Sequence, residues 1–107
     1  GVTAISGSGP AYVFLFIEAL QQAAAELGFT PEQGRRLAIE TVQGAAALAA
    51  QSSEPASTLR ERVTSKGGTT EAALRVMAEK GVKDGIIAGC HAAAARGQEL
   101  GKILGAA

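Results

Sequence analysis

The chain has 107 residues, with ten basic and ten acidic residues and therefore no net charge. Chains of this length form one domain, and an apolar fraction of 47% with only 4% aromatic residues predicts one core of small and branched side chains between packed helices. The balanced charge, without a basic cluster, argues against a surface for nucleic acid or an anionic membrane. We therefore expect neither a nucleic acid nor a membrane as a partner.

Membrane spans and disulfides are not expected either. The apolar run 11–17 ends at Glu18, short of the ~20 residues that a membrane helix needs. No leader sequence precedes it, so we expect a soluble, cytoplasmic protein. Cys90 is the single cysteine, which leaves no internal disulfide and no metal pair, and we expect no metal site. The chain begins with Gly1 and lacks an initiator Met, which we interpret as a fragment of a longer protein.

Helical spacing of apolar residues predicts an all-α fold of about five helices, one of them short, without a β-strand. The first helix is expected over about residues 10–27. It follows a flexible, phosphate-loop-like stretch (residues 7–10), has Ser8 or Gly9 as its N-cap and closes at Gly28.

The second helix has the clearest start signal in the chain. Thr30 is the expected cap, Pro follows it, and Gln33 completes a capping box, so the helix is expected to run to about Gln51. It carries one broad face of apolar and small residues: Leu37, Ala38, Thr41, Val42, Ala45, Leu48 and Ala49.

Three more helices are expected in the second half. Ser57 is the expected cap of a short helix to about residue 63, and Thr69 or Thr70 caps a helix that ends near residue 80. The last helix is expected over about residues 83–104.

This last helix has small residues at every fourth position: Gly85, Gly89, Ala93, Gly97, Gly101 and Gly105. Residues four apart form one ridge, and a ridge without side chains allows close approach of another backbone. Each glycine costs ~1 kcal/mol of helix propensity relative to alanine, so the pattern implies a compensating contact. We expect a packing partner, which a second copy of the chain can supply.

The most polar and glycine-rich stretch, residues 63–71, is the candidate for chemistry. Gly67 and Gly68 allow successive N–H groups to converge, and the following helix start adds unpaired N–H donors at its positive end. Hydroxyls and one positive charge add to these donors: Ser65, Lys66, Thr69 and Thr70. The pattern differs from a Walker A loop, and a carboxylate is the expected guest. An ordinary loop followed by a helix cap has the same composition, and Glu71 would repel an anion if it faced the same way.

Four other residues are expected to be structural. Cys90 and His91 point ~100° apart on a helix and have no evident partner. Tyr12 is expected to pack as a ring with a hydrogen-bonded hydroxyl, and Glu18 receives no role.

Four segments, in order, resemble the C-terminal domain of pyrroline-5-carboxylate reductases. The most specific is Val63–Thr70 (VTSKGGTT), and its company with SGSGPAYVF near the N-terminus makes coincidence improbable. The segments are residues 6–14, 44–46, 59–70 and 93–100. Many members of that family have proline where this chain has Lys66.

The resemblance implies the final step of proline biosynthesis, in which NADPH or NADH reduces 1-pyrroline-5-carboxylate to L-proline. In that family an N-terminal Rossmann domain, absent from this chain, holds the cofactor. The helical domains of two subunits interlock, which implies a homodimer or a higher oligomer built from it. Residues 1–107 would be this dimerisation and substrate-binding domain, inactive when isolated.

The resemblance also assigns residues. The carboxylate of the substrate would be held by Ser65, Gly67, Gly68, Thr69 and Thr70. Thr70 would be the catalytic residue, with a hydrogen bond to the ring nitrogen. Ser8, Gly9 and Pro10 would lie near the nicotinamide edge of the pocket.

Two other interpretations are compatible with the sequence. The chain could be a non-catalytic helical oligomerisation module, or the helical domain of another Rossmann-coupled dehydrogenase. The block 65–70 argues against the second, because a different substrate would need different chemistry there.

Overall fold

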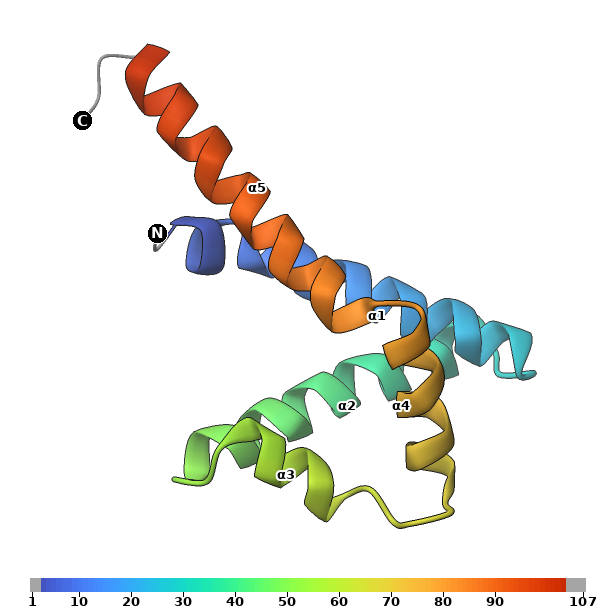
Figure 1. Ribbon diagram of the computed structural model, residues 1–107. Helices are drawn as coiled ribbons and strands as arrows, with labels where there is room; N and C mark the ends of the chain where they lie inside the picture. Colours follow the sequence, from blue (N-terminus) through green and yellow to red (C-terminus); the bar gives the residue numbers. More distant parts are fainter. Residues whose placement is uncertain (1–2, 104–107) are drawn as a thin grey trace. The chain divides into compact units, whose positions relative to one another are not determined.

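The computed structural model describes residues 3–103, which are helical apart from short connections (Figure 1). A short π-helix, η1, is followed by five α-helices, and no strand occurs in this range, so the predicted all-α fold is confirmed. The elements are η1 Thr3–Gly7, α1 Gly9–Glu26, α2 Pro31–Gln51, α3 Ala56–Arg62, α4 Thr69–Glu79 and α5 Val82–Ile103.

The chain divides into two compact units. One contains the N-terminal residues up to Val13 together with the residues from Leu74 onwards, and thus η1 and α5. The other is Phe14–Ala73, which contains most of α1, all of α2 and α3, and the loop before α4.

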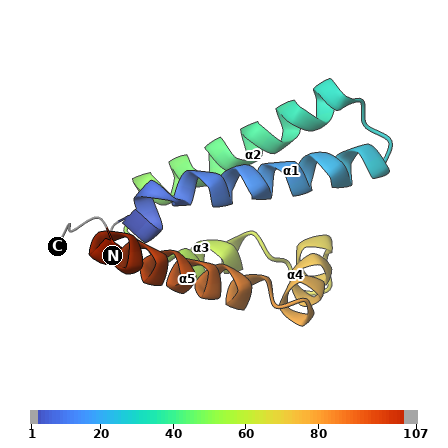
Figure 2. The ribbon, with the colours of Figure 1, turned by 90° about the horizontal axis from the view of Figure 1, so that it is seen from above.

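Helices α1 and α2 form an antiparallel hairpin (Figure 2). Gly28 has a φ of 101°, and the N–H groups of Gly28 and Phe29 donate to the carbonyls of Ala25 and Ala24 at 3.1 and 3.0 Å, which is a Schellman motif. Two residues later, Thr30 and Gln33 exchange the two hydrogen bonds of a capping box. Both local predictions, the stop at Gly28 and the start at Thr30, are confirmed.

The contact between α1 and α2 is made by small residues. Ala24 and Ala38 are 9% and 2% exposed, and Gly34 is also buried. The larger residues of the predicted α2 face stay accessible, with Leu37 44% and Leu48 62% exposed. Of the small and branched side chains expected in the core, only small ones are fully buried among the described residues. The backbones of α1 and α2 approach too closely for the branched side chains, whose apolar surface stays accessible.

The starts of α3 and α4 differ from the prediction. Helix α3 begins one residue before Ser57, and the carbonyl of Pro55 accepts the N–H groups of Thr58 and Leu59 at 3.0 and 3.1 Å. Pro55, with a φ of −61° and a ψ of 151°, thus occupies the N-cap position without a side-chain bond. Helix α4 already includes Thr69, and its first turn is closed by the Ala72 N–H bound to the Gly68 carbonyl at 3.3 Å.

The N-terminal segment is helical where the sequence predicted a flexible loop. The Ser8 N–H donates to the Thr3 carbonyl at 2.9 Å, which closes the wide turn of η1, and Ser8 directly precedes α1. The Tyr12 hydroxyl donates to the carbonyl of the buried Ala4 at 2.9 Å, and η1 packs against α5. The hydrogen-bonded hydroxyl expected for Tyr12 is confirmed.

The segment Thr3–Glu26 spans 24 residues and contains an 18-residue window with a mean hydropathy of 1.2, enough by length and composition to cross a membrane. Glu18 lies within α1 and interrupts its apolar stretch without ending the helix, in agreement with the helix predicted over about residues 10–27. A single helix of this kind near an N-terminus is weak support for a membrane span, since core helices have the same composition.

Helix α5 begins one residue before the predicted position and carries the glycine ridge. A Cβ added at Gly85, Gly89 or Gly97 would meet nothing within 4 Å. Next to the ridge, Ile86 and Ile87 are 56% and 45% exposed. At these three positions the close contact that the ridge predicts is not made by the described residues. Gly105 and the predicted helix end at Leu104 lie outside them.

Candidate functional site

The candidate site is built around a tight turn between α3 and α4. The Gly68 N–H donates to the Ser65 carbonyl at 3.0 Å, and Gly67 has a φ of 76°. Only glycines have positive φ among the described residues, so Lys66 has a negative one. These features define a type II turn, which favours proline at its second residue and glycine at its third. The backbone conformation of this turn thus accounts for the two consecutive glycines.

A side chain is disfavoured at Gly67 and at Gly68 for different reasons. Gly67 supplies the positive φ that L side chains rarely adopt. At Gly68 an added Cβ would lie 3.2 Å from the Ser65 carbonyl oxygen, so a side chain would crowd the turn's own acceptor.

Glu71, in the first turn of α4, reaches back to the turn. Its Oε1 accepts the N–H of Gly67 at 3.1 Å, and the residue is half-buried. A carboxylate at this end of a helix is favoured by the helix dipole. The anion closest to the candidate cradle is therefore part of the chain itself.

The remaining donors belong to the start of α4. The first helical bond runs from Ala72 to Gly68, so the N–H groups of Thr69 and Thr70 precede it and have no intrahelical acceptor. Thr69 is exposed and Thr70 is half-buried, with hydroxyls on the same turn. This arrangement offers N–H and O–H donors to a small anion at the positive end of a helix.

The predicted loop residues lie together in the turn and the start of α4, but they differ in whether their N–H groups are already hydrogen-bonded. The N–H groups of both glycines are already engaged, one by Ser65 and one by Glu71. The expectation that both glycine N–H groups converge on a guest therefore does not describe this conformation. The N–H groups of Thr69 and Thr70 have no helical acceptor, and Ser65 and Lys66 are exposed beside them.

Ser8, Gly9 and Pro10 belong to the other unit. The Ser8 N–H and carbonyl are both bonded, to Thr3 and Ala11, and Gly9 and Pro10 open α1. A dinucleotide needs a strand, a glycine-rich turn and a helix for its pyrophosphate, and residues 3–103 contain no strand. These residues do not fit a complete NAD(P)H site.

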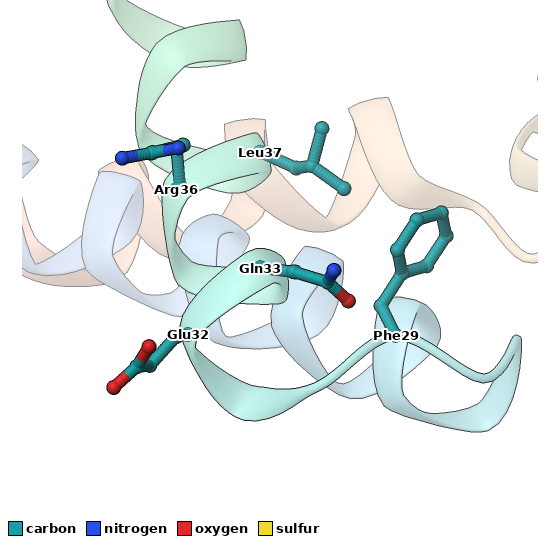
Figure 3. A pocket seen from close by; sticks show the side chains of 5 residues that line it. All are labelled: Phe29, Glu32, Gln33, Arg36 and Leu37. Atoms are coloured by element: carbon teal, nitrogen blue, oxygen red, sulfur yellow. The ribbon is translucent and has the colours of Figure 1, made fainter.

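Two hollows of the Phe14–Ala73 unit lie away from this turn. A pocket of about 380 Å³ follows the hairpin turn, where Phe29, Gln33 and Leu37 turn to one side of α2 and Glu32 and Arg36 to the other (Figure 3). A mostly apolar groove of about 620 Å³ runs between α2 and α3. It is lined by Ala45, Leu48, Ala49, Gln51, Ser52, Ala56, Leu59, Arg60, Arg62 and Val63. Neither hollow includes residues 65–70.

Metal chemistry has no support in this range. Within residues 3–103, no three His, Cys, Asp or Glu side chains come close enough to hold a metal ion. Cys90 is half-buried and His91 exposed.

Known proteins of one family match the chain. The family model for pyrroline-5-carboxylate reductase dimerisation matches residues 1–100. The pyrroline-5-carboxylate reductase of Pseudomonas aeruginosa is 43% identical over 104 residues, covering 97% of this chain and 38% of the relative. That of Vibrio alginolyticus is 46% identical, covering 96% of this chain and 38% of the relative.

Solved structures agree with the sequence relatives. The structure of Plasmodium falciparum pyrroline carboxylate reductase with NADP bound matches with a TM-score of 0.90 and 33% identity, over 94% of this chain and 38% of that one. The Coxiella burnetii pyrroline-5-carboxylate reductase matches with a TM-score of 0.88 and 45% identity, over 92% of this chain and 37% of that one.

The chain therefore spans less than two fifths of the length of these relatives. With a family model that matches residues 1–100 and a fold shared at a TM-score of 0.90, the chain belongs to the pyrroline-5-carboxylate reductase dimerisation family.

Proposed function

We propose that the chain is the dimer-forming, substrate-binding part of an NAD(P)H-dependent pyrroline-5-carboxylate reductase, which reduces 1-pyrroline-5-carboxylate to L-proline. The observation that carries the proposal is the Ser65–Gly68 turn at the start of α4, within a chain that matches this family over residues 1–100. The turn gives the VTSKGGTT block a defined shape, and the helix start behind it suits a carboxylate.

The substrate has a carboxylate and a ring with an imine nitrogen, and the loop has hydrogen-bond donors for both groups. The carboxylate is held by the N–H and hydroxyl groups of Thr69 and Thr70, with Ser65 and the glycine backbone completing the cradle. The Thr70 hydroxyl also bonds the ring nitrogen and so fixes which face of the C=N carbon meets the hydride donor. Such positioning is a large part of what a protein contributes when a cofactor carries the reactive chemistry.

The cofactor is NADPH or NADH and supplies the hydride when bound. Its pyrophosphate site belongs to a Rossmann domain outside this chain, because residues 3–103 lack the strand that such a site needs. Ser8, Gly9 and Pro10 of this chain border the nicotinamide. Isolated residues 1–107 are consequently inactive.

The partner is a second copy of the chain. The uncovered α5 ridge and exposed apolar side chains on α1, such as Phe14 at 63% and Leu15 at 66%, support a homodimer with interlocked helices. The same dimer accounts for the apolar helix Thr3–Glu26 without a membrane. We place the enzyme in the cytoplasm, with no nucleic-acid partner.

The test is the reductase activity of the full-length enzyme with pyrroline-5-carboxylate and NADPH, wild type against Thr70→Ala. We expect kcat/KM to fall about 100-fold, or about 2.7 kcal/mol of transition-state stabilisation. Thr64→Ala is the matched control, because Thr64 lies just after α3 and its hydroxyl donates to the Arg60 carbonyl of that helix at 2.5 Å. Thr70→Ser, which keeps a hydroxyl, should restore most of the activity.

The outcomes separate the parts of the proposal. An active wild type with an unaffected Thr70→Ala variant would keep the enzyme and reject the site. An inactive wild type would favour a helical oligomerisation module whose loop binds nothing.

A further inference from the structure

A carboxylate of the protein itself is bound to an N–H donor of the turn before α4. Glu71 Oε1 accepts the Gly67 N–H at 3.1 Å, and Gly67 lies in the block that the proposed function assigns to the substrate carboxylate. One carboxylate of the protein thus makes a contact of the kind that the carboxylate of the substrate would make. The two anions have the same chemistry and compete for the same group of donors.

The turn does not depend on Glu71 for its shape. It is closed by the Gly68 N–H and the Ser65 carbonyl at 3.0 Å, and its left-handed position is filled by a glycine. The Glu71 side chain is half-buried and rises from a helix that is already formed, so loss of its bond to Gly67 does not open the turn.

Charge gives the contact a second effect. The Glu71 carboxylate lies beside the turn, and Thr69 and Thr70 present their donors within the same helical turn, whose pitch is about 5.4 Å. Two carboxylates at such a separation repel each other, and at a partly exposed site this repulsion changes affinity by about 3- to 10-fold. Lys66 is exposed beside them and brings one positive charge to a loop that would hold two negative ones.

We propose that Glu71 is an internal competitor of the substrate carboxylate: its side chain occupies the Gly67 N–H in the unliganded loop and is displaced when substrate binds. The inference rests on the proposed function of the same loop. Glu71 thereby sets the affinity for carboxylate ligands, and its loss strengthens their binding.

The experiment compares the full-length wild type with Glu71→Gln. Glutamine keeps a side-chain oxygen that can accept the Gly67 N–H, but it removes the charge. We expect the KM for pyrroline-5-carboxylate and the inhibition constant of L-proline to fall about 3- to 10-fold, while kcat changes by less than about 2-fold. In ~1 M salt the difference from wild type should shrink, because screening weakens the repulsion.

The matched control is Glu79→Gln, which removes the same charge from the other end of α4, where the residue is exposed. Its kinetic constants should equal those of the wild type. A similar gain in the control would assign the effect to net charge and overturn the proposal.

A second variant distinguishes competition between Glu71 and the substrate carboxylate from structural support of the turn by Glu71. Glu71→Ala removes both the charge and the acceptor, and under the proposal it also lowers the KM. If Glu71→Ala raises the KM while Glu71→Gln leaves it unchanged, Glu71 only braces the turn and the proposal is wrong. An active wild type with unchanged Glu71→Gln constants overturns this inference alone, whereas an inactive wild type rejects the proposed function as well.

Discussion

An added Cβ at Gly34 of α2 would lie 3.3 Å from the Cβ of Ala24 in α1. The next neighbour of that Cβ, the Gln21 carbonyl oxygen, would lie 3.6 Å away. The spacing between the two helices is thus set by the absence of a side chain at one position.

Replacing Gly34 with leucine should therefore destabilise the hairpin. The larger side chain cannot fit against Ala24, and overpacking costs about 1–3 kcal/mol, more than the gain in helix propensity of about 0.8 kcal/mol. Arg35→Leu adds the same side chain at the next, exposed position and should change the free energy of unfolding little. Urea unfolding followed by circular dichroism measures both, and equal midpoints would show that α1 and α2 separate at no cost.

The capping box should contribute measurably to α2. Thr30→Ala removes the side-chain oxygen that accepts the Gln33 N–H at 3.2 Å, and we expect a loss of about 1 kcal/mol. Thr41→Ala makes the same change within α2, where the hydroxyl donates to the Leu37 carbonyl at 2.6 Å. There alanine should be neutral or slightly stabilising, because such back-bonding competes with the helix. Thermal unfolding of the two variants would contradict the prediction if Thr41→Ala were the more damaging.

The type II turn makes opposite predictions at its two central residues. Lys66→Pro should stabilise by about 0.4–1 kcal/mol, because proline suits the second position and restricts the unfolded chain. The turn's hydrogen bond joins Gly68 to Ser65 and does not use the Lys66 N–H. Gly67→Ala forces a side chain to a φ of 76° and should destabilise by about 1 kcal/mol or more. Denaturant midpoints that move in the same direction for both variants would argue against this turn type.

The ridge on α5 should matter only in the dimer. A Cβ added at Gly97 would meet nothing within 4 Å among residues 3–103, so we expect an effect of Gly97→Leu to come from a partner. We expect sedimentation equilibrium to show weaker association by about 10-fold or more, the cost of overpacking in a close helix contact. Gln98→Leu, exposed on the adjacent face ~100° away, is the control. Identical association of both variants would place the interface elsewhere.

The sequence predicted best where a helix boundary depends on local chemistry. Thr30 and Gln33 lie three residues apart, and Gly28 needs only its own φ, so these ends could be placed without knowledge of the fold. The prediction failed at Ser57, because a serine in a first turn is an equally ordinary helical residue once the Pro55 carbonyl starts the helix.

Burial was predicted less well than helix boundaries. Periodicity identifies the apolar face of α2, but it does not say whether that face meets this chain or another copy, and Leu48 remains 62% exposed. In the candidate site, the glycines and threonines could be named from the block, and Glu71 could be identified as an anion near it. Its bond to Gly67 depends on a side-chain rotamer, which a sequence does not specify.

The hairpin of α1 and α2 has a consequence for the order in which the molecule forms. Its stop signal, its start signal and its Ala24–Gly34 contact all lie close together along the chain. Contacts of such low sequence separation form fast, with helices growing in about a microsecond and short loops closing in about 100 ns. Meeting a second molecule depends on concentration and is slower. We therefore expect the α1–α2 hairpin to form before the chain associates with a partner. Association then starts from a hairpin that has already folded.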